Sequence, residues 1–149
     1  MTIAVGSDHG GFELKQAMLI HLNEVGVEFK DFGVFCDESA DYPDIAVQVA
    51  EAVARGDYEK GLLFCGTGVG ISIAANKVTG IRAANCHDVF SAQMSREHND
   101  ANILAMGGRV IGPGLAAMIL DVWLSTDFAG GRHGRRIGKI SAYEQGRPL

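Results

Sequence analysis

Strand-like and helix-like segments alternate regularly along this chain, and that alternation is the strongest constraint on its fold. Short apolar runs predict buried strands, and the stretches between them place apolar residues on one helical stripe. We expect strands near residues 3–5, 27–32, 61–64, 81–85 and 102–106, and helices near 12–25, 43–55, 71–77, 89–97 and 113–123. Strands that alternate with helices predict a parallel sheet covered by helices on both faces.

Composition favours one ordinary globular domain. The 149 residues are 47% hydrophobic, and we expect a single domain over residues 1–149. The net charge of −5 disfavours nucleic acid or a membrane surface as a partner. We expect neither a signal peptide nor a membrane span, and we therefore expect a cytoplasmic location. Cys36, Cys65 and Cys86 form neither a disulfide framework nor a paired metal motif, and no metal site is expected.

Residues 65–70 read Cys-Gly-Thr-Gly-Val-Gly and lie between an expected strand and an expected helix. Glycines let main-chain N–H groups face a ligand, and the start of a helix adds partial positive charge. This setting favours the thiolate of Cys65, although burial as a small apolar residue is the usual fate of a free cysteine. Cys36 and Cys86 lack such a setting and are expected to be structural.

A nucleotide site is an alternative interpretation of the same glycines. A phosphate-binding loop of the Gly-Lys-Ser/Thr type is excluded, because no such sequence follows. A dinucleotide-binding loop stays open, because Asp88 lies about the right distance downstream to bond a ribose. Against it, the spacing is GxGxG rather than GxGxxG, and the loop follows the third expected strand rather than the first.

Other polar residues also follow expected strands. Asp8 and His9 follow the first strand, and His87 and Asp88 follow the fourth. Ligands of parallel sheets bind beyond the carboxyl ends of the strands. Asp8 and His9 therefore suit a site beside Cys65, although Asp8 as the N-cap of the next helix is an equal alternative.

One histidine follows a helix rather than a strand. His98 suits general acid–base catalysis near neutral pH. The alternative is that His98-Asn99-Asp100 only ends the helix, with Asn99 in the left-handed region.

The C-terminal tail is basic and rich in glycine. Its basic residues are Arg132, His133, Arg135, Arg136, Lys139 and Arg147. Arginine forks match phosphate oxygens, so the tail suits an anion, although a solvated charged surface is common. Arg109, after two glycines, is a weaker candidate. We expect the tail to be helical in part, around residues 137–143, and to pack on this domain or cross to a neighbouring subunit.

These groups suit a small phosphorylated substrate whose reaction creates negative charge on oxygen. Proton abstraction beside a carbonyl does so, and it needs a base and main-chain donors aimed at that oxygen. A non-catalytic module that binds a sugar phosphate stays open as an alternative. It would need the arginines and the glycine loop but no reactive thiol.

Several segments together carry a family resemblance. They are residues 7–12 (Ser-Asp-His-Gly-Gly-Phe), 41–43 (Asp-Tyr-Pro), 65–77, 95–100 (Ser-Arg-Glu-His-Asn-Asp) and 130–133 (Gly-Gly-Arg-His). Through them the chain resembles the type B ribose-5-phosphate isomerase family, which includes allose-6-phosphate and galactose-6-phosphate isomerases. A second branch of that family has a glutamate base later in the same loop. Ile71 stands in that part of the loop here, so the resemblance is to the cysteine branch.

The resemblance implies an aldose–ketose isomerase that interconverts ribose 5-phosphate and ribulose 5-phosphate through a cis-enediolate. Cys65 would be the base that moves a proton between C1 and C2. Thr67 and His98 would open the furanose ring, with Asp8 close by. Asn99 and the N–H groups of Gly66, Gly68 and Gly70 would hold the enediolate. The phosphate would bind His9, Arg132 and Arg136, with lesser contributions from Arg109 and His133, and Tyr42 would line the sugar pocket.

The same resemblance implies a five-stranded parallel sheet in the order 2-1-3-5-4 within a three-layer αβα sandwich. It implies no cofactor. The basic tail would reach a neighbouring subunit, so a homodimer or homotetramer would share its active sites. Allose 6-phosphate, galactose 6-phosphate and a tetrose phosphate are the alternative substrates.

Overall fold

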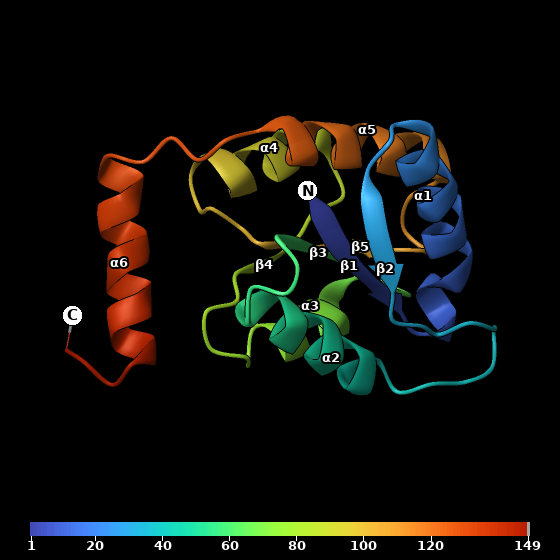
Figure 1. Ribbon diagram of the computed structural model, residues 1–149, viewed down its shortest axis with the longest axis horizontal. Coiled ribbons are helices and arrows are strands. Elements are labelled where there is room, and N and C mark those ends of the chain that lie inside the picture. The colour runs from blue at the N-terminus through green and yellow to red at the C-terminus, as the bar shows by residue number, and fades with distance from the viewer. Residues whose placement is uncertain (149) are drawn as a thin grey trace.

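The alternating segments fold into a parallel sheet between two layers of helices. The computed structural model describes residues 1–148 of the chain. Over that range the sheet has five strands in the order β2-β1-β3-β5-β4, which confirms the expected order (Figure 1). The strands are β1 (Thr2–Ser7), β2 (Glu28–Asp31), β3 (Lys60–Cys65), β4 (Ala83–Asn85) and β5 (Ile103–Gly107).

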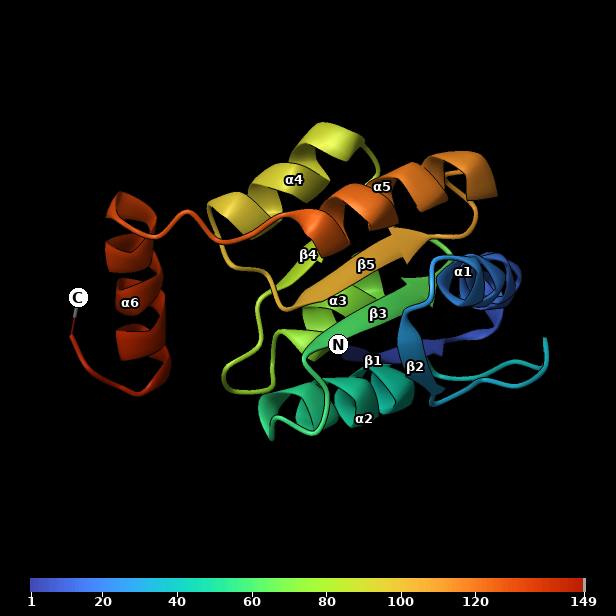
Figure 2. The same ribbon diagram turned by 45° about the horizontal axis from the view of Figure 1, so that its top comes forward.

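Helices cover both faces of this sheet (Figures 1 and 2). One face packs against α1 (Phe12–Glu24), α4 (Val89–Glu97) and α5 (Pro113–Ser125), and the other against α2 (Tyr42–Ala54) and α3 (Val69–Ala75). A short 3-10 turn, η1 (His9–Gly11), joins β1 to α1. The expected strands and helices are confirmed, with shorter second and fourth strands.

Alternate residues of a strand point to opposite faces, and this period separates the two cores. In β3, Leu62 and Phe64 pack on the α1–α4–α5 side, whereas Leu63 and Cys65 pack on the α2–α3 side. Cys65 therefore ends its strand facing the helix that follows it.

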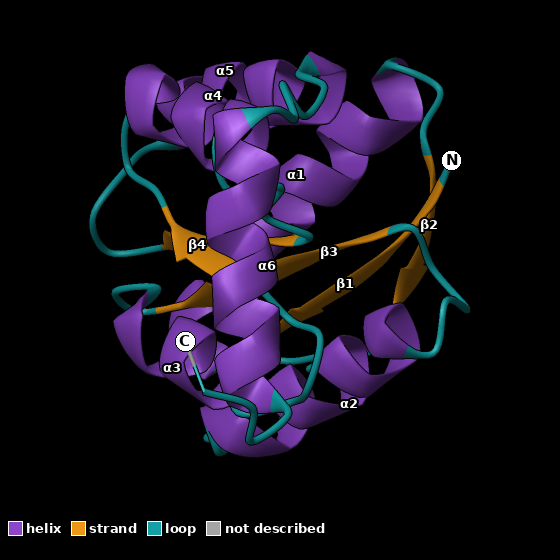
Figure 3. Ribbon diagram, turned by 90° about the vertical axis from the view of Figure 1, so that its left-hand side faces the viewer, coloured by secondary structure: helices purple, strands orange, loops and turns teal. Residues whose placement is uncertain are grey.

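The C-terminal tail is more regular than the sequence predicts. It forms a continuous helix, α6 (Arg132–Glu144), although Gly134 and Gly138 each disfavour a helix by about 1 kcal/mol. The helix stands apart from the three layers, beside the β4 edge (Figures 1 and 3). Within the described chain none of its residues is buried, and Ile140 and Tyr143 are 56% and 72% exposed. An amphipathic helix with no fully buried residue has apolar side chains that remain available to pack elsewhere.

None of the helices between residues 1 and 148 combines the length and the apolarity that a membrane span needs.

Gly11 is expected to tolerate no side chain, because its α-carbon lies against the end of β3. A Cβ there would meet the carbonyl group of Phe64 and lie 2.6 Å from the nitrogen of Cys65. We expect Gly11→Ala to lower the free energy of unfolding by about 2 kcal/mol or more, because main-chain atoms cannot move aside cheaply. Urea unfolding followed by circular dichroism measures this difference.

Gly114→Ala is the matched control. Gly114 lies in the first turn of α5 with open space around its α-carbon, so alanine there should be neutral or slightly stabilising. Equal destabilisation by the two substitutions would contradict the prediction.

Candidate active site

Cys65 ends β3 with its thiol buried beside the loop that follows. Its side chain is 4% exposed, and the N–H of Gly68 donates to Sγ at 3.0 Å. Gly68 has a φ of +76°, a conformation that L-residues rarely adopt. Glycine therefore allows the turn that points this donor at the sulfur. A donor directed at sulfur stabilises negative charge there.

The loop that follows the thiol also supplies a hydroxyl group and main-chain N–H groups. Thr67 is exposed, and its Oγ1 accepts a hydrogen bond from the N–H of Val69 at 3.3 Å. Gly70 and Ile71 lie in the first turn of α3, where N–H groups have no carbonyl within the helix to bond. These donors suit an oxygen that becomes negative during a reaction.

Asp8 and His9 lie beside this loop, because β1 is the neighbour of β3. The N–H of Asp8 donates to the carbonyl oxygen of Phe64 at 3.1 Å. Its buried carboxylate accepts from the N–H of Gly11 at 3.0 Å, so Asp8 does act as an N-cap, that of η1. His9 is exposed, and its Nδ1 accepts from the N–H of Ala40 at 3.2 Å.

Tyr42 and Arg109 close the same end of the sheet. Tyr42 covers Gly70, where a Cβ would lie 2.8 Å from its ring atom Cζ. Arg109 donates its N–H to the carbonyl oxygen of Gly66 at 3.0 Å, and its guanidinium lies alongside that glycine. We call Asp8, His9, Tyr42, Arg109 and residues 65–70 the carboxyl-edge cluster.

His98 lies elsewhere, at the end of α4, where its ring stacks on His133 of α6. The two ring centroids are 4.1 Å apart, and the planes differ by 7°. The pKa of His133 is lowered, mainly by partial burial and to a lesser extent by the nearby charges of His98 and Arg132. The N–H of Ala129 donates to the carbonyl oxygen of Glu97 at 3.0 Å, which fixes the tail to the end of α4.

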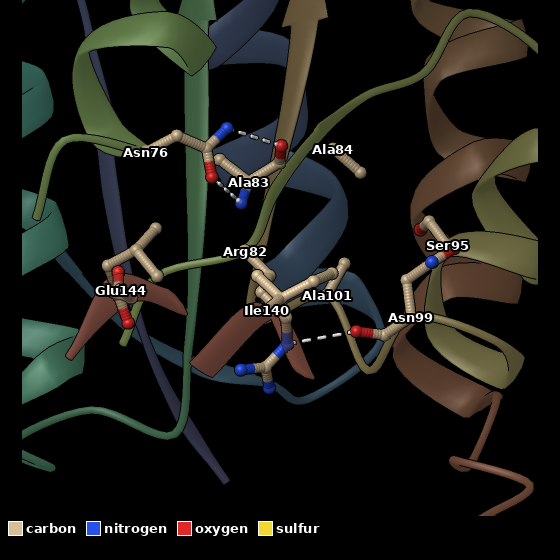
Figure 4. A pocket seen from close by; sticks show the side chains of 10 residues that line it. Asn76, Arg82, Ala83, Ala84, Ser95, Asn99, Ala101, Ile140 and Glu144 are labelled. Atoms are coloured by element: carbon tan, nitrogen blue, oxygen red, sulfur yellow. Dashed lines mark hydrogen bonds between the residues drawn. The ribbon is translucent and has the colours of Figure 1, made fainter. Parts of the chain in front are cut away.

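The backbone after His98 differs from the expectation that Asn99 is left-handed. His98 is the C-cap of α4 with a φ of −99°, and Asp100 is the residue with positive φ, at +45°. The carboxylate of Asp100 pairs with Arg96 at 2.9 Å and with Arg82 at 3.1 Å, which holds it there. Arg82 also donates to the carbonyl oxygen of Asn99 (Figure 4). We call His98, Asn99, Arg132, His133 and Arg136 the amino-edge cluster.

The two clusters lie at opposite ends of the sheet. His98 and Asn99 precede β5, whose first residue, Ile103, pairs with Gly61, whereas Cys65 pairs with Gly107 at the far end. About 13 Å of strand separates the two levels, at roughly 3.3 Å per residue. Within one chain, therefore, His98, Asn99 and the tail arginines do not join Cys65.

A cavity of 420 Å³ opens beside the amino-edge cluster, between β4, the end of α4 and α6. Asn99, Arg82 and Ile140 are among its lining residues (Figure 4). The amide of Asn76 bonds both main-chain groups of Ala83, at 2.8 and 2.9 Å. That amide occupies the outward main-chain groups of Ala83, so at this residue an occupant of the cavity packs against side chains rather than extending the sheet.

Asp88, on which the dinucleotide interpretation depends, is the N-cap residue of α4. Its carboxylate caps α4, accepting from Ser91 N at 2.7 Å and Ser91 Oγ at 2.6 Å. These bonds with Ser91 lower the pKa of Asp88. Over residues 1–148 no group of three or more His, Cys, Asp or Glu side chains is arranged to hold a metal ion.

The sequence patterns assigned no role to three residues that contact these clusters or the strands beside them. Asn85 and His87, at the end of β4, touch the Cys65 loop and the end of β5. The fully buried Lys15 bonds both carboxylate oxygens of Asp31 at 2.8 Å and the carbonyl oxygen of Val34 at 2.6 Å. His87 was noted as an edge residue after a strand, whereas no pattern distinguishes Asn85 or Lys15.

Residues 3–140 match the family model described as Ribose/Galactose Isomerase. The chain is 56% identical over 145 residues to ribose-5-phosphate isomerase B of Escherichia coli (strain K12), covering 97% of each chain. It is 43% identical over 145 residues to D-erythrulose-4-phosphate isomerase of Pectobacterium atrosepticum, covering 97% of this chain and 95% of that one.

Solved structures of proteins with this family's name are also similar to this chain. Ribose-5-phosphate isomerase B of Clostridium thermocellum superimposes with a TM-score of 0.97 at 55% identity, over 98% of this chain and 99% of that one. Ribose-5-phosphate isomerase B of Mycoplasma genitalium, with bound ribulose-5-phosphate, gives a TM-score of 0.92 at 40% identity, over 97% and 96%.

The two cysteines outside the loop should differ sharply in reactivity. Cys86 is buried, and burial raises the pKa of its thiol, whereas Cys36 is exposed, contrary to its expected structural role. A raised pKa leaves less thiolate at any pH below it, so iodoacetamide at neutral pH should modify Cys36 first and Cys86 only after unfolding. Peptide mass spectrometry over time, with and without urea, measures both. Modification of the two at the same rate in the folded protein would contradict this.

Proposed function

The chain belongs to the ribose/galactose isomerase family and is a sugar-phosphate isomerase, and we propose that it interconverts ribose 5-phosphate and ribulose 5-phosphate. The relatives named ribose-5-phosphate isomerase B, one of them solved with ribulose-5-phosphate, support this choice. A tetrose phosphate is the second candidate, because a relative named D-erythrulose-4-phosphate isomerase covers nearly the whole chain.

The observation that carries the proposal is the buried thiol of Cys65 with the N–H of Gly68 directed at its sulfur. As a thiolate, Cys65 takes the proton from C2 of the open-chain aldose and returns it to C1, while the proton of the C2 hydroxyl passes to the C1 oxygen. The carbonyl oxygen becomes negative in the intervening enediolate. Main-chain donors at the start of α3 stabilise that oxygen, at about 3 kcal/mol each, and a positioned base contributes roughly 10²–10⁴-fold.

The sugar must first open its ring. We assign this step to Thr67 and His98, with the carboxylate of Asp8 nearby. The hydroxyl of Thr67 lies in the loop that follows the thiol, and the carboxylate of Asp8 is held by its hydrogen bond from Gly11. His98 comes from the amino-edge cluster, so this step needs both clusters in one site.

We propose that two copies of the chain share each site. The amino-edge cluster of one copy completes the carboxyl-edge cluster of its partner and adds Arg132 and Arg136 to His9 around the phosphate. The unburied α6, with its exposed Ile140 and Tyr143, and the adjoining cavity offer the second copy a surface. A two-fold pairing brings both clusters together twice, giving two equivalent sites.

Replacing Cys65 tests the base. Cys65→Ala should lower kcat for ribose 5-phosphate by at least about 10²-fold while leaving binding of the sugar phosphate near normal, since the phosphate ligands remain. Coupled turnover assays and calorimetric binding measure the two effects. Cys36→Ser is the matched control and should retain full activity; near-normal turnover by Cys65→Ala would exclude the role.

A panel of aldose phosphates with four, five and six carbons tests the substrate. The five-carbon substrate should have the highest kcat/KM with wild-type protein. A higher value for the tetrose phosphate would favour the second candidate.

Mixed dimers test the shared site. Cys65→Ala and His98→Ala are each expected to be inactive, and unfolding and refolding them together should restore about a quarter of wild-type activity. Random pairing makes about half of the dimers mixed, and one of the two sites in each mixed dimer is intact. Mixing Cys65→Ala with Thr67→Ala, which damage the same cluster, should restore none. No recovery in the first mixture would contradict sharing.

A further inference from the structure

The end of β4 supports the Cys65 loop from the side away from β1. His87 lies just beyond this strand, and its Nε2 accepts a hydrogen bond from the N–H of Gly107 at 2.9 Å. Cys86, the residue before it, is the last to bond β5, through the carbonyl oxygen of Ala105. The imidazole thus takes the place of the carbonyl acceptor that a longer β4 would offer. This bond requires the tautomer with the proton on Nδ1.

Gly107 transmits this contact to the loop. A Cβ on Gly107 would lie 2.7 Å from the carbonyl carbon of Thr67 and 2.8 Å from its α-carbon. Because the two main chains touch without intervening side chains, the position of Gly107 sets the position of Thr67. The residues that follow add two ties: Gly108 N donates to the Cys65 carbonyl at 2.8 Å, and Arg109 N to that of Gly66 at 3.0 Å.

Asn85 provides a second contact from the same strand end. Its Nδ2 makes a long hydrogen bond of 3.5 Å to the carbonyl oxygen of Thr67. Its Oδ1 is buried, has no hydrogen-bond partner among residues 1–148, and lies where a Cβ on Gly68 would point. Asn85 therefore packs directly behind the residue whose N–H bonds the sulfur of Cys65.

We propose that His87 is a positioning residue for the isomerase reaction, acting with Asn85 to hold Thr67 and Gly68 against the thiol. The proposal rests on the function proposed above. His87 itself reaches the thiol only through Gly107 and the loop. Misplacement of a reacting group by about 1 Å can cost 10²-fold in rate, so loss of this support should lower kcat more than it raises KM.

Substitutions of His87 distinguish the effect of its hydrogen-bond acceptor from the effect of the size of its ring. His87→Gln places an amide oxygen near the position of Nε2, whereas His87→Leu has no acceptor and His87→Asn is too short to supply one there. We expect His87→Leu and His87→Asn to lower kcat about 10-fold or more, with KM within about threefold, and His87→Gln to stay within about threefold of wild type. His21→Leu is the control, because it removes a histidine of α1 that bonds Asp121 of α5 and belongs to neither cluster. It should leave kcat unchanged.

A readout independent of turnover separates this inference from the proposed function. In a Cys36→Ser background, the rate of alkylation of Cys65 by iodoacetamide reports how the loop presents the sulfur. His87→Leu and His87→Asn should change that rate several-fold, and His87→Gln should not. If wild-type protein turns over no aldose phosphate, the proposed function fails and the alkylation rates still test the support.

Two outcomes would overturn the inference. One is a wild-type kcat and alkylation rate in His87→Asn, which tests the point even where His87→Leu fails to fold. The other is a loss in His87→Gln equal to that in His87→Asn, because the acceptor would then not be what matters.

Discussion

Direct contact between main chains at the carboxyl ends of β1, β3 and β5 is the constraint on which the rest of the site depends. Gly11 lies on the carbonyl group of Phe64, and Gly107 lies on Thr67, with no side chain between them. Main-chain atoms have few alternative positions in such contacts, so the loop after Cys65 is located by its neighbours as well as by its own glycines. The hydrogen bond from Gly68 to the sulfur is the last contact in that series.

The order of elements also decides what one chain cannot assemble. Residues that follow a strand lie at the carboxyl edge of a parallel sheet, and residues that follow a helix lie at the amino edge. Asp8 and Cys65 belong to the first group and His98 to the second, so no rotation of side chains brings them together. The position of α6, beside β4 and clear of the three layers, adds the tail arginines to the same remote edge (Figure 3). The proposed sharing between two copies would reconcile these positions with one reaction.

Sequence patterns predicted the features that depend on period and order. Apolar runs located the strands, and the chain's resemblance supplied the order that puts Asp8 beside Cys65. Features that depend on long-range contacts were not predictable in the same way. The left-handed residue is Asp100, whose carboxylate is held by Arg82 and Arg96. Arg82 reaches Asp100 only once the chain has folded, so the local sequence does not reveal this contact. Asn85 reads as an ordinary strand residue until the loop lies against it.

The proposed mechanism ties the length of the substrate to the positions of the thiol and the tail arginines. In that mechanism the reacting carbons lie at Cys65 and the phosphate binds arginines of α6, so the distance between these two groups sets which sugar fits. In the proposed shared site that distance would be set by the contact between copies, because the thiol and the arginines would come from different chains. A shift in how α6 meets its partner would change the preferred sugar without altering any residue of the Cys65 loop. Relatives named for pentose and tetrose phosphates each match nearly the whole of this chain, so the segments that they share do not by themselves determine the sugar.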